Sequence, residues 1–105
     1  MQNPLMIIIY ITCKDETEAE KLGKKIVEEK LAACYNFFCI NSGYPWQGKI
    51  QEDNEYVLLL KTKEENYEKI KVKVKQMHSY EIPCILKLNV EANKEYEDWL
   101  NEQVA

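Results

Sequence analysis

Two short segments that are apolar at every position constrain the fold of this chain most strongly. One is Met6–Ile11, and the other is Tyr56–Leu60 within the longer segment Glu55–Thr62. A strand with one face in water alternates apolar and polar residues, whereas a strand buried on both faces does not. We therefore predict two strands, at 6–11 and 55–62, that are covered on both faces of one sheet.

Two further strands and a hairpin turn complete the predicted sheet. The segments Ala33–Ile40 and Cys84–Val90 read as the second and fourth strands. Asn41-Ser42-Gly43 has turn chemistry, so we expect the chain to reverse there. Tyr44–Ile50 then begins the return arm, and a polar break at Gln51–Asn54 precedes the third strand.

Charged segments with helical periodicity separate the strands. Asp15 is placed to cap a first helix, with Glu18 three residues later as in a capping box. The segment Glu64–Met77 alternates lysines with apolar residues as a strand would, but its early glutamates and late lysines complement a helix dipole, and we favour a helix. Asn93 is placed to cap a short last helix. The apolar stripes of the three helices are Ala19, Leu22, Ile26 and Val27; Tyr67, Ile70, Val74 and Met77; and Tyr96, Trp99 and Leu100.

This order predicts one α+β domain over residues 1–105, with 1–4 as a loose tail. It is a ferredoxin-like βαββαβ antiparallel sheet with an extra C-terminal helix. Two helices cover only one face of such a sheet, whereas strands one and three are apolar on both faces. The second face would be a large exposed apolar patch, so we expect a partner chain to cover it.

Composition excludes several classes of protein. The 105 residues carry a net charge of −4 and include no arginine, which argues against a nucleic-acid partner. The longest apolar run, Leu5–Ile11, is too short to span a bilayer. No signal peptide is evident and no cysteine pair has C-x-x-C spacing, so we expect free thiols in the cytoplasm.

The segment His78–Cys84 concentrates reactive side chains at the junction of a helix and a strand. The start of strand four runs beside the end of strand one, so Cys84 is expected to approach Cys13. Two thiolates and the imidazole of His78 would form a soft site for copper(I) or zinc. The alternative is that both cysteines are inert core residues.

Several ordered motifs resemble one family. His78–Cys84 resembles the His-Pro-Tyr-Glu-x-Pro-Glu signature of the CutA family, the divalent-cation tolerance proteins, although Ser79 replaces its first proline and Cys84 its last acid. Three more segments match in order between about Met6 and Leu100, namely Lys30–Cys34, Tyr44–Ile50 and Leu60–Thr62. The resemblance implies a homotrimer with inward-packed sheets and a long hairpin between strands two and three. It also implies copper binding by a cysteine nearer Ile11, the histidine at this turn and the acid that Cys84 replaces.

A cleft beside this segment is a second candidate site. Tyr80 could donate a hydrogen bond, and Glu81 could orient the imidazole of His78. The alternative is that these residues only connect the end of a helix to the start of a strand. Trp46, Tyr44 and Lys49 could line an anion pocket. For the aromatic residues Tyr44 and Trp46 we favour an interface, where aromatic side chains are enriched. We expect Lys61 to face the same cleft, on the assumption that strands one and three run parallel and end together.

The leading functional prediction is a cytoplasmic CutA-like trimer that binds divalent or soft metal ions, copper in particular, and contributes to metal tolerance. We predict no enzyme, because no nucleophile with an adjacent base is visible. The alternatives are a trimeric signalling module of the PII kind or a scaffold for partner proteins. An acylphosphatase-like hydrolase is disfavoured because such chemistry needs an arginine cradle.

Overall fold

The computed structural model describes residues 6–105, so the predicted tail at 1–4 lies outside the described residues. Strand β1 (Met6–Cys13) is followed by helix α1 (Glu16–Glu28) and by the long strands β2 (Cys34–Trp46) and β3 (Lys49–Lys63). A 3-10 turn η1 (Glu64–Asn66) leads into helix α2 (Tyr67–Met77), strand β4 (Ile85–Asn89) and helix α3 (Lys94–Gln103). The predicted βαββαβ order with an added C-terminal helix is confirmed.

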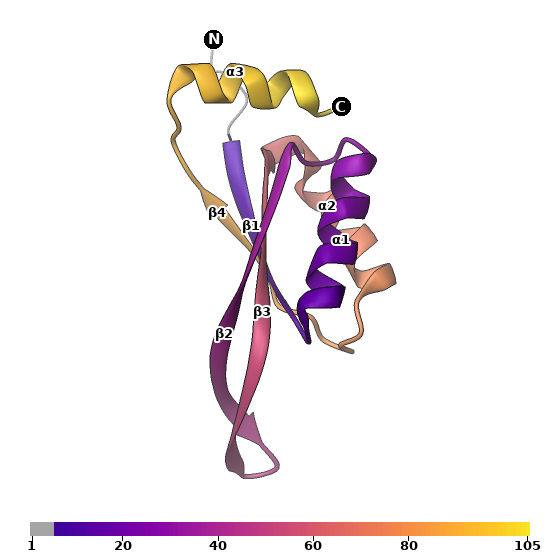
Figure 1. Cartoon of the computed structure of the whole chain (residues 1–105), viewed down its shortest axis with the longest axis vertical. Helices are drawn as coiled ribbons and strands as arrows, with labels where there is room; N and C mark the ends of the chain where they lie inside the picture. Colours follow the sequence, from indigo (N-terminus) through magenta and orange to yellow (C-terminus); the bar gives the residue numbers. More distant parts are fainter. Residues whose placement is uncertain (1–5) are drawn as a thin grey trace.

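The four strands form one antiparallel sheet in the order β2-β3-β1-β4 (Figure 1). The crossover through α1 makes β2 parallel to β1, and the hairpin then reverses β3. The expectation that strands one and three run parallel was therefore wrong. Met6 pairs with Lys63 and Cys13 pairs with Tyr56, so the start of β1 lies beside the end of β3 and the end of β1 lies beside the middle of β3.

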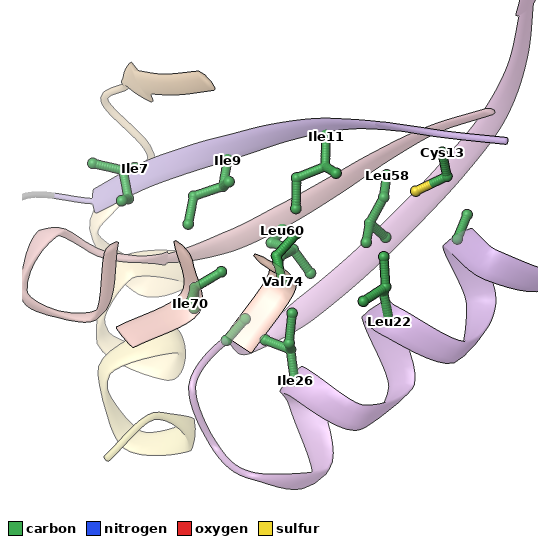
Figure 2. Close-up of a cluster of buried hydrophobic side chains, with 12 residues drawn as sticks. Ile7, Ile9, Ile11, Cys13, Leu22, Ile26, Leu58, Leu60, Ile70 and Val74 are labelled. Atoms are coloured by element: carbon green, nitrogen blue, oxygen red, sulfur yellow. The ribbon is translucent and has the colours of Figure 1, made fainter. Parts of the chain in front are cut away.

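Helices α1 and α2 cover one face of the sheet and enclose the main core (Figure 2). The odd-numbered residues of β1, from Ile7 to Cys13, and the even-numbered Leu58 and Leu60 of β3 point into this core and are fully buried. The helices contribute Ala19, Leu22, Ile26, Ile70 and Val74. The helical reading of 64–77 is confirmed, with a first turn in 3-10 geometry.

The predicted turn at Asn41-Ser42-Gly43 was wrong, because β2 continues through these residues to Trp46. The chain reverses at Gln47 and Gly48, which have φ of 51° and 77°. Positive φ at both central residues is typical of a type I′ turn, one of the two mirror-image turns whose twist matches that of the flanking strands in a two-residue hairpin loop. The resulting long hairpin extends well beyond the helices (Figure 1) and gives the chain its greatest extent, 50 Å.

The other face of the sheet, called here the open face, carries apolar side chains that no helix covers along most of its length. Alternation along the strands assigns to it Val57, Phe38, Leu86 and Leu88, of which the last three are about half exposed. Helix α3 covers only one end, where Leu100 and Val104 pack on Met6. The apolar character of β1 and β3 on both faces is thus present in the structure.

The helix caps differ in detail from their predicted form. Asp15 accepts a hydrogen bond from the amide of Glu18 at 2.8 Å and caps α1 as expected. Asn93 occupies the N-cap position of α3, but its side chain bonds the carboxylate of Glu95 and no backbone amide. Within residues 6–105, no helix has both the length and the apolar character that crossing a bilayer requires.

Candidate functional site

Cys13, Glu18 and His78 meet at one end of the sheet, on the side that the helices cover. Cys13 ends β1, Glu18 lies in the first turn of α1, and His78 immediately follows α2. One potential ligand atom from each lies within 4.8 Å of the other two. The sequence prediction that Cys13 and His78 converge agrees with this grouping, and we call the three residues the Cys13 group.

His78 is held by the backbone through both ring nitrogens. Its side chain is fully buried; Nε2 lies 2.7 Å from the carbonyl oxygen of Thr12, and Nδ1 accepts a hydrogen bond from the amide of Tyr80 at 3.0 Å. An amide donates and a carbonyl accepts, so these two bonds require the neutral tautomer with its proton on Nε2. The rings of His78 and Tyr80 also pack with centroids 4.8 Å apart.

Glu18 joins three parts of the chain at this site. One carboxylate oxygen accepts from the amide of Lys14 at 2.9 Å, and the other accepts from the amide of Ser79, also at 2.9 Å. Burial raises the pKa of Glu18, but the N–H donors of Lys14 and Ser79 outweigh it and hold the pKa below its usual value.

The sequence reasoning missed Glu18 as a member of the site because it interpreted the residue only as a helix cap. A signal was available, since side chains in the first turn of a helix lean back toward the preceding strand. Cys13 and His78 were already expected near that strand end. An acid placed one turn into the following helix is therefore in reach of them.

The thiol of Cys13 is protonated in this environment. Its residue is fully buried, and burial is the main reason that its pKa is raised to about 12, with the carboxylates of Glu18, Asp15 and Glu55 adding to the effect. Since a metal binds the thiolate, ligation would cost a proton.

Cys84 is not part of this group. Ile85 pairs with Ile11 and packs against the helix-side core, so the preceding residue, Cys84, turns toward the open face. There it lines a pocket together with Thr12. The predicted approach of strand four to strand one is correct, yet alternation along the strand places the two thiols on different sides of the sheet.

This open-face pocket has a volume of about 870 Å³ and lies between the hairpin and the segment Tyr80–Cys84. Of the five residues predicted for the cleft, Trp46, Tyr80 and Glu81 line it. Lys49 pairs with Trp46 at the hairpin turn and does not line it. The placement of Lys61 in the cleft was wrong, because β3 runs antiparallel to β1. Lys61 pairs with Ile8, near the start of β1 and away from the cleft. Its ammonium lies there 5.7 Å from the ring centroid of Tyr96.

The Cys13 group fits a soft metal ion in donor type and in spacing. Thiolate, imidazole and carboxylate are all ligands of zinc, and thiolate with imidazole also suits copper(I). Ligand atoms around one zinc ion lie about 3.5 Å apart, and His78 Nε2 is 3.8 Å from a Glu18 oxygen. Binding would require Cys13 to lose its proton. It would also require the ring proton of His78 to move from Nε2 to Nδ1, which breaks both the bond to Thr12 and the bond from the amide of Tyr80.

Comparison with known proteins agrees with the motifs and the fold. Residues 7–103 match the family described as CutA1 divalent ion tolerance protein. The divalent-cation tolerance protein CutA of Archaeoglobus fulgidus is 43% identical over 97 residues, which cover 91% of this chain and 95% of that protein. The CutA protein of Thermotoga maritima is 41% identical over 100 residues, which cover 94% of this chain and 99% of that protein.

A solved structure shows the same likeness in three dimensions. The structure of the A. fulgidus protein, described as a periplasmic divalent cation tolerance protein, superimposes with a TM-score of 0.92 at 41% identity. The match covers 96% of this chain and all of that one. Because the family match spans nearly the whole chain and the relatives share its fold and length, the protein belongs to the CutA1 family of divalent ion tolerance proteins.

Proposed function

We propose that this protein contributes to divalent-cation tolerance as a homotrimer that binds a soft metal ion, copper(I) or zinc, through Cys13, Glu18 and His78. The observation that carries the proposal is the convergence of a thiol, a carboxylate and an imidazole within 4.8 Å. This group replaces the predicted set of Cys13, His78 and Cys84, because Cys84 faces the other side of the sheet.

Each residue of the group has a defined part in binding. Cys13 supplies the soft ligand that favours copper(I) and zinc over magnesium or calcium. Glu18 supplies a charged oxygen that is already ionised at neutral pH, since its pKa is lowered. His78 supplies Nε2 once its ring proton has moved to Nδ1. A metal-binding histidine donates through its second nitrogen, so the hydrogen bond that Nδ1 now accepts from the amide of Tyr80 would be lost on binding.

The homotrimer is proposed from the open face. Phe38, Leu86 and Leu88 expose between 46% and 50% of their surface there, although they lie on strands rather than in loops. Other copies of the chain are the simplest partners that would remove such a patch from water. The family resemblance gives three as the number of copies.

The cytoplasm is proposed as the location, and binding rather than catalysis as the activity. All four cysteines are free, which suits a reducing compartment. A PII-like nucleotide site gains no support from the open-face pocket, since its lining includes Asp53, Glu55 and Glu81 and, among residues 6–105, no lysine. Cell fractionation tests the location, and recovery outside the cytoplasm would contradict it.

Calorimetric titration with zinc, and with copper(I) under anaerobic conditions, tests the metal proposal. The Cys13→Ser variant keeps the size of the side chain and should lose at least tenfold in affinity, or about 1.4 kcal/mol. Cys39→Ser is the matched control, because Cys39 is exposed and lies outside the group. The proposal fails if the wild type binds no metal more tightly than millimolar, or if Cys39→Ser loses as much affinity as Cys13→Ser.

A further inference from the structure

Glu18 is held differently from His78, its neighbour in the Cys13 group. Its Oε1 atom accepts from the amide of Lys14 and lies 3.8 Å from His78 Nε2, while its Oε2 atom accepts from the amide of Ser79 at 2.9 Å. A carboxylate oxygen has two lone pairs, so Oε1 keeps one for an ion after its bond to Lys14. Glu18 can therefore bind a metal and retain both amide bonds, whereas His78 must give up both of its own.

The bond from Ser79 fixes the carboxylate relative to the imidazole. Lys14 is only four positions from Glu18, so the bond from its amide is local to the start of α1. Ser79 is 61 positions away and directly follows His78, so its amide connects one potential ligand to the other. A glutamate that is free to rotate loses rotamer entropy when it binds an ion, and the bond from Ser79 removes part of that cost in advance.

A fixed carboxylate matters more for zinc than for copper(I). The thiolate of Cys13 alone balances the single charge of copper(I), whereas the two charges of zinc need the carboxylate of Glu18 as well. An unbalanced charge is costly here, because Cys13 and the side chain of His78 are fully buried and the side chain of Glu18 is only 9% exposed. Carboxylate oxygen is also a regular ligand of zinc, whereas copper(I) prefers soft sulfur ligands.

We propose that the backbone amide of Ser79 positions Glu18 as an oxygen ligand and so raises the affinity of the Cys13 group for zinc but not for copper(I). This selectivity rests on the proposed function, because it belongs to the same site. Ser79 acts through Glu18 and is a positioning residue. Loss of its amide should therefore weaken zinc binding and leave the thiolate and imidazole ligands of copper(I) in place.

Proline at position 79 removes the amide proton and suits the backbone before it. His78 has φ of −73° and ψ of 143°, an extended conformation that a following proline favours. Ser79→Pro should weaken zinc binding about tenfold or more, as loss of a group that orients a metal ligand does, and should change copper(I) binding by less than about threefold. Competition with chelators of known affinity measures both ions, copper(I) under anaerobic conditions. Every chain in the comparison carries Cys34→Ser, Cys39→Ser and Cys84→Ser, so that Cys13 is the only thiol.

Glu18→Gln tests the same ligand without a change in the backbone, and it keeps the test available if Ser79→Pro does not fold. It preserves the size of the side chain and removes its charge, so the loss should again be about tenfold or more for zinc and small for copper(I). Ser79→Ala is the conservative variant; it keeps the amide and should retain more zinc affinity than Ser79→Pro. Glu20→Gln, an exposed change on the same helix, should alter neither affinity.

The outcomes separate the selectivity from the proposed function. Equal losses for zinc and copper(I) in Ser79→Pro would indicate a general structural effect and would overturn the role of Ser79. A loss of zinc affinity in Ser79→Ala as large as in Ser79→Pro, or full zinc affinity in Glu18→Gln, would overturn it too. In these three cases the wild type still binds metal, and the proposed function stands. A wild type that binds neither ion more tightly than millimolar would overturn both.

Discussion

In the folded chain, the Nε2 atom of His78 lies 2.7 Å from the carbonyl oxygen of Thr12. This contact joins the end of α2 to the end of β1 across 66 positions of sequence. It also fixes which ring nitrogen carries the proton. Any ion that binds Nε2 must compete with the Thr12 carbonyl, so the affinity of the Cys13 group for metal includes the cost of breaking this bond.

The reactivity of the cysteines should differ strongly with their burial. At pH 8, Cys13 should react with iodoacetamide at least about 100-fold more slowly than Cys39, because its thiol is buried and its pKa is raised to about 12. Mass spectrometry of timed digests gives the rate at each site. In denaturant the two rates should become equal, and equal rates in the native protein would refute the buried, protonated state of Cys13.

Glu18 should make stability depend on pH in the acid range. The pKa of Glu18 is lowered in the fold, so its contribution is fully present above the unfolded value of 4.5 and is lost as pH falls through the lower folded value. Denaturant unfolding of Glu18→Gln should therefore show a loss at pH 7 that shrinks below about pH 4.5. Glu20→Gln, an exposed change on the same helix, should show neither effect; a pH-independent difference for Glu18→Gln would rule out the ionised contact.

The hairpin should tolerate a methyl group at Gly43, within strand β2, but not at Gly48, in the turn. Gly48 has φ of 77°, a conformation that costs an L-residue about 1–2 kcal/mol, so Gly48→Ala should destabilise the protein by about that amount. Gly43→Ala is the control, because its new methyl would meet only Ile50 at 3.9 Å, an ordinary contact. Urea unfolding measures both, and equal stability of the two variants would contradict the placement of the turn at Gln47 and Gly48.

The proposed trimer should depend on the open face. Leu88→Glu places a charge on that face and should dissociate the assembly into monomers. Val72→Glu is the matched control, because Val72 is also an exposed apolar residue, at 56%, but lies on α2 on the opposite side of the sheet. Sedimentation equilibrium separates the outcomes. A wild-type monomer at micromolar concentration, or dissociation of the Val72→Glu variant, would show that the open face is not the contact surface.

Periodicity was sufficient to predict the elements of this fold, because each strand and helix buries a face with its own repeat. It was not sufficient for the turn, since Asn41-Ser42-Gly43 has better turn residues than Gln47-Gly48 does. Pairing with β3 continues through Asn41-Ser42-Gly43, and the positive φ values of the turn occur at Gln47 and Gly48. The turn preference of Asn41-Ser42-Gly43 was therefore outweighed by the pairing of the two long strands.

The candidate site was predictable only in part, for reasons that concern side-chain direction. Cys13 and Cys84 lie near each other along the paired strands, but strand alternation sends neighbouring positions to opposite faces. A prediction that is correct to within one residue can therefore be wrong about the face. Glu18 joined the site from the first turn of α1. The lean of first-turn side chains toward the preceding strand indicates this contact, but the sequence reasoning interpreted Glu18 only as part of the helix cap.

The most direct test of the central proposal is the anomalous X-ray density of crystals soaked with copper under reducing conditions. We predict one strong peak within bonding distance of Cys13 Sγ and His78 Nε2, with a Glu18 oxygen beside it and the Thr12 contact broken. A peak at Cys84 or Cys39 with the Cys13 group unchanged, or no peak at all, would contradict the assignment.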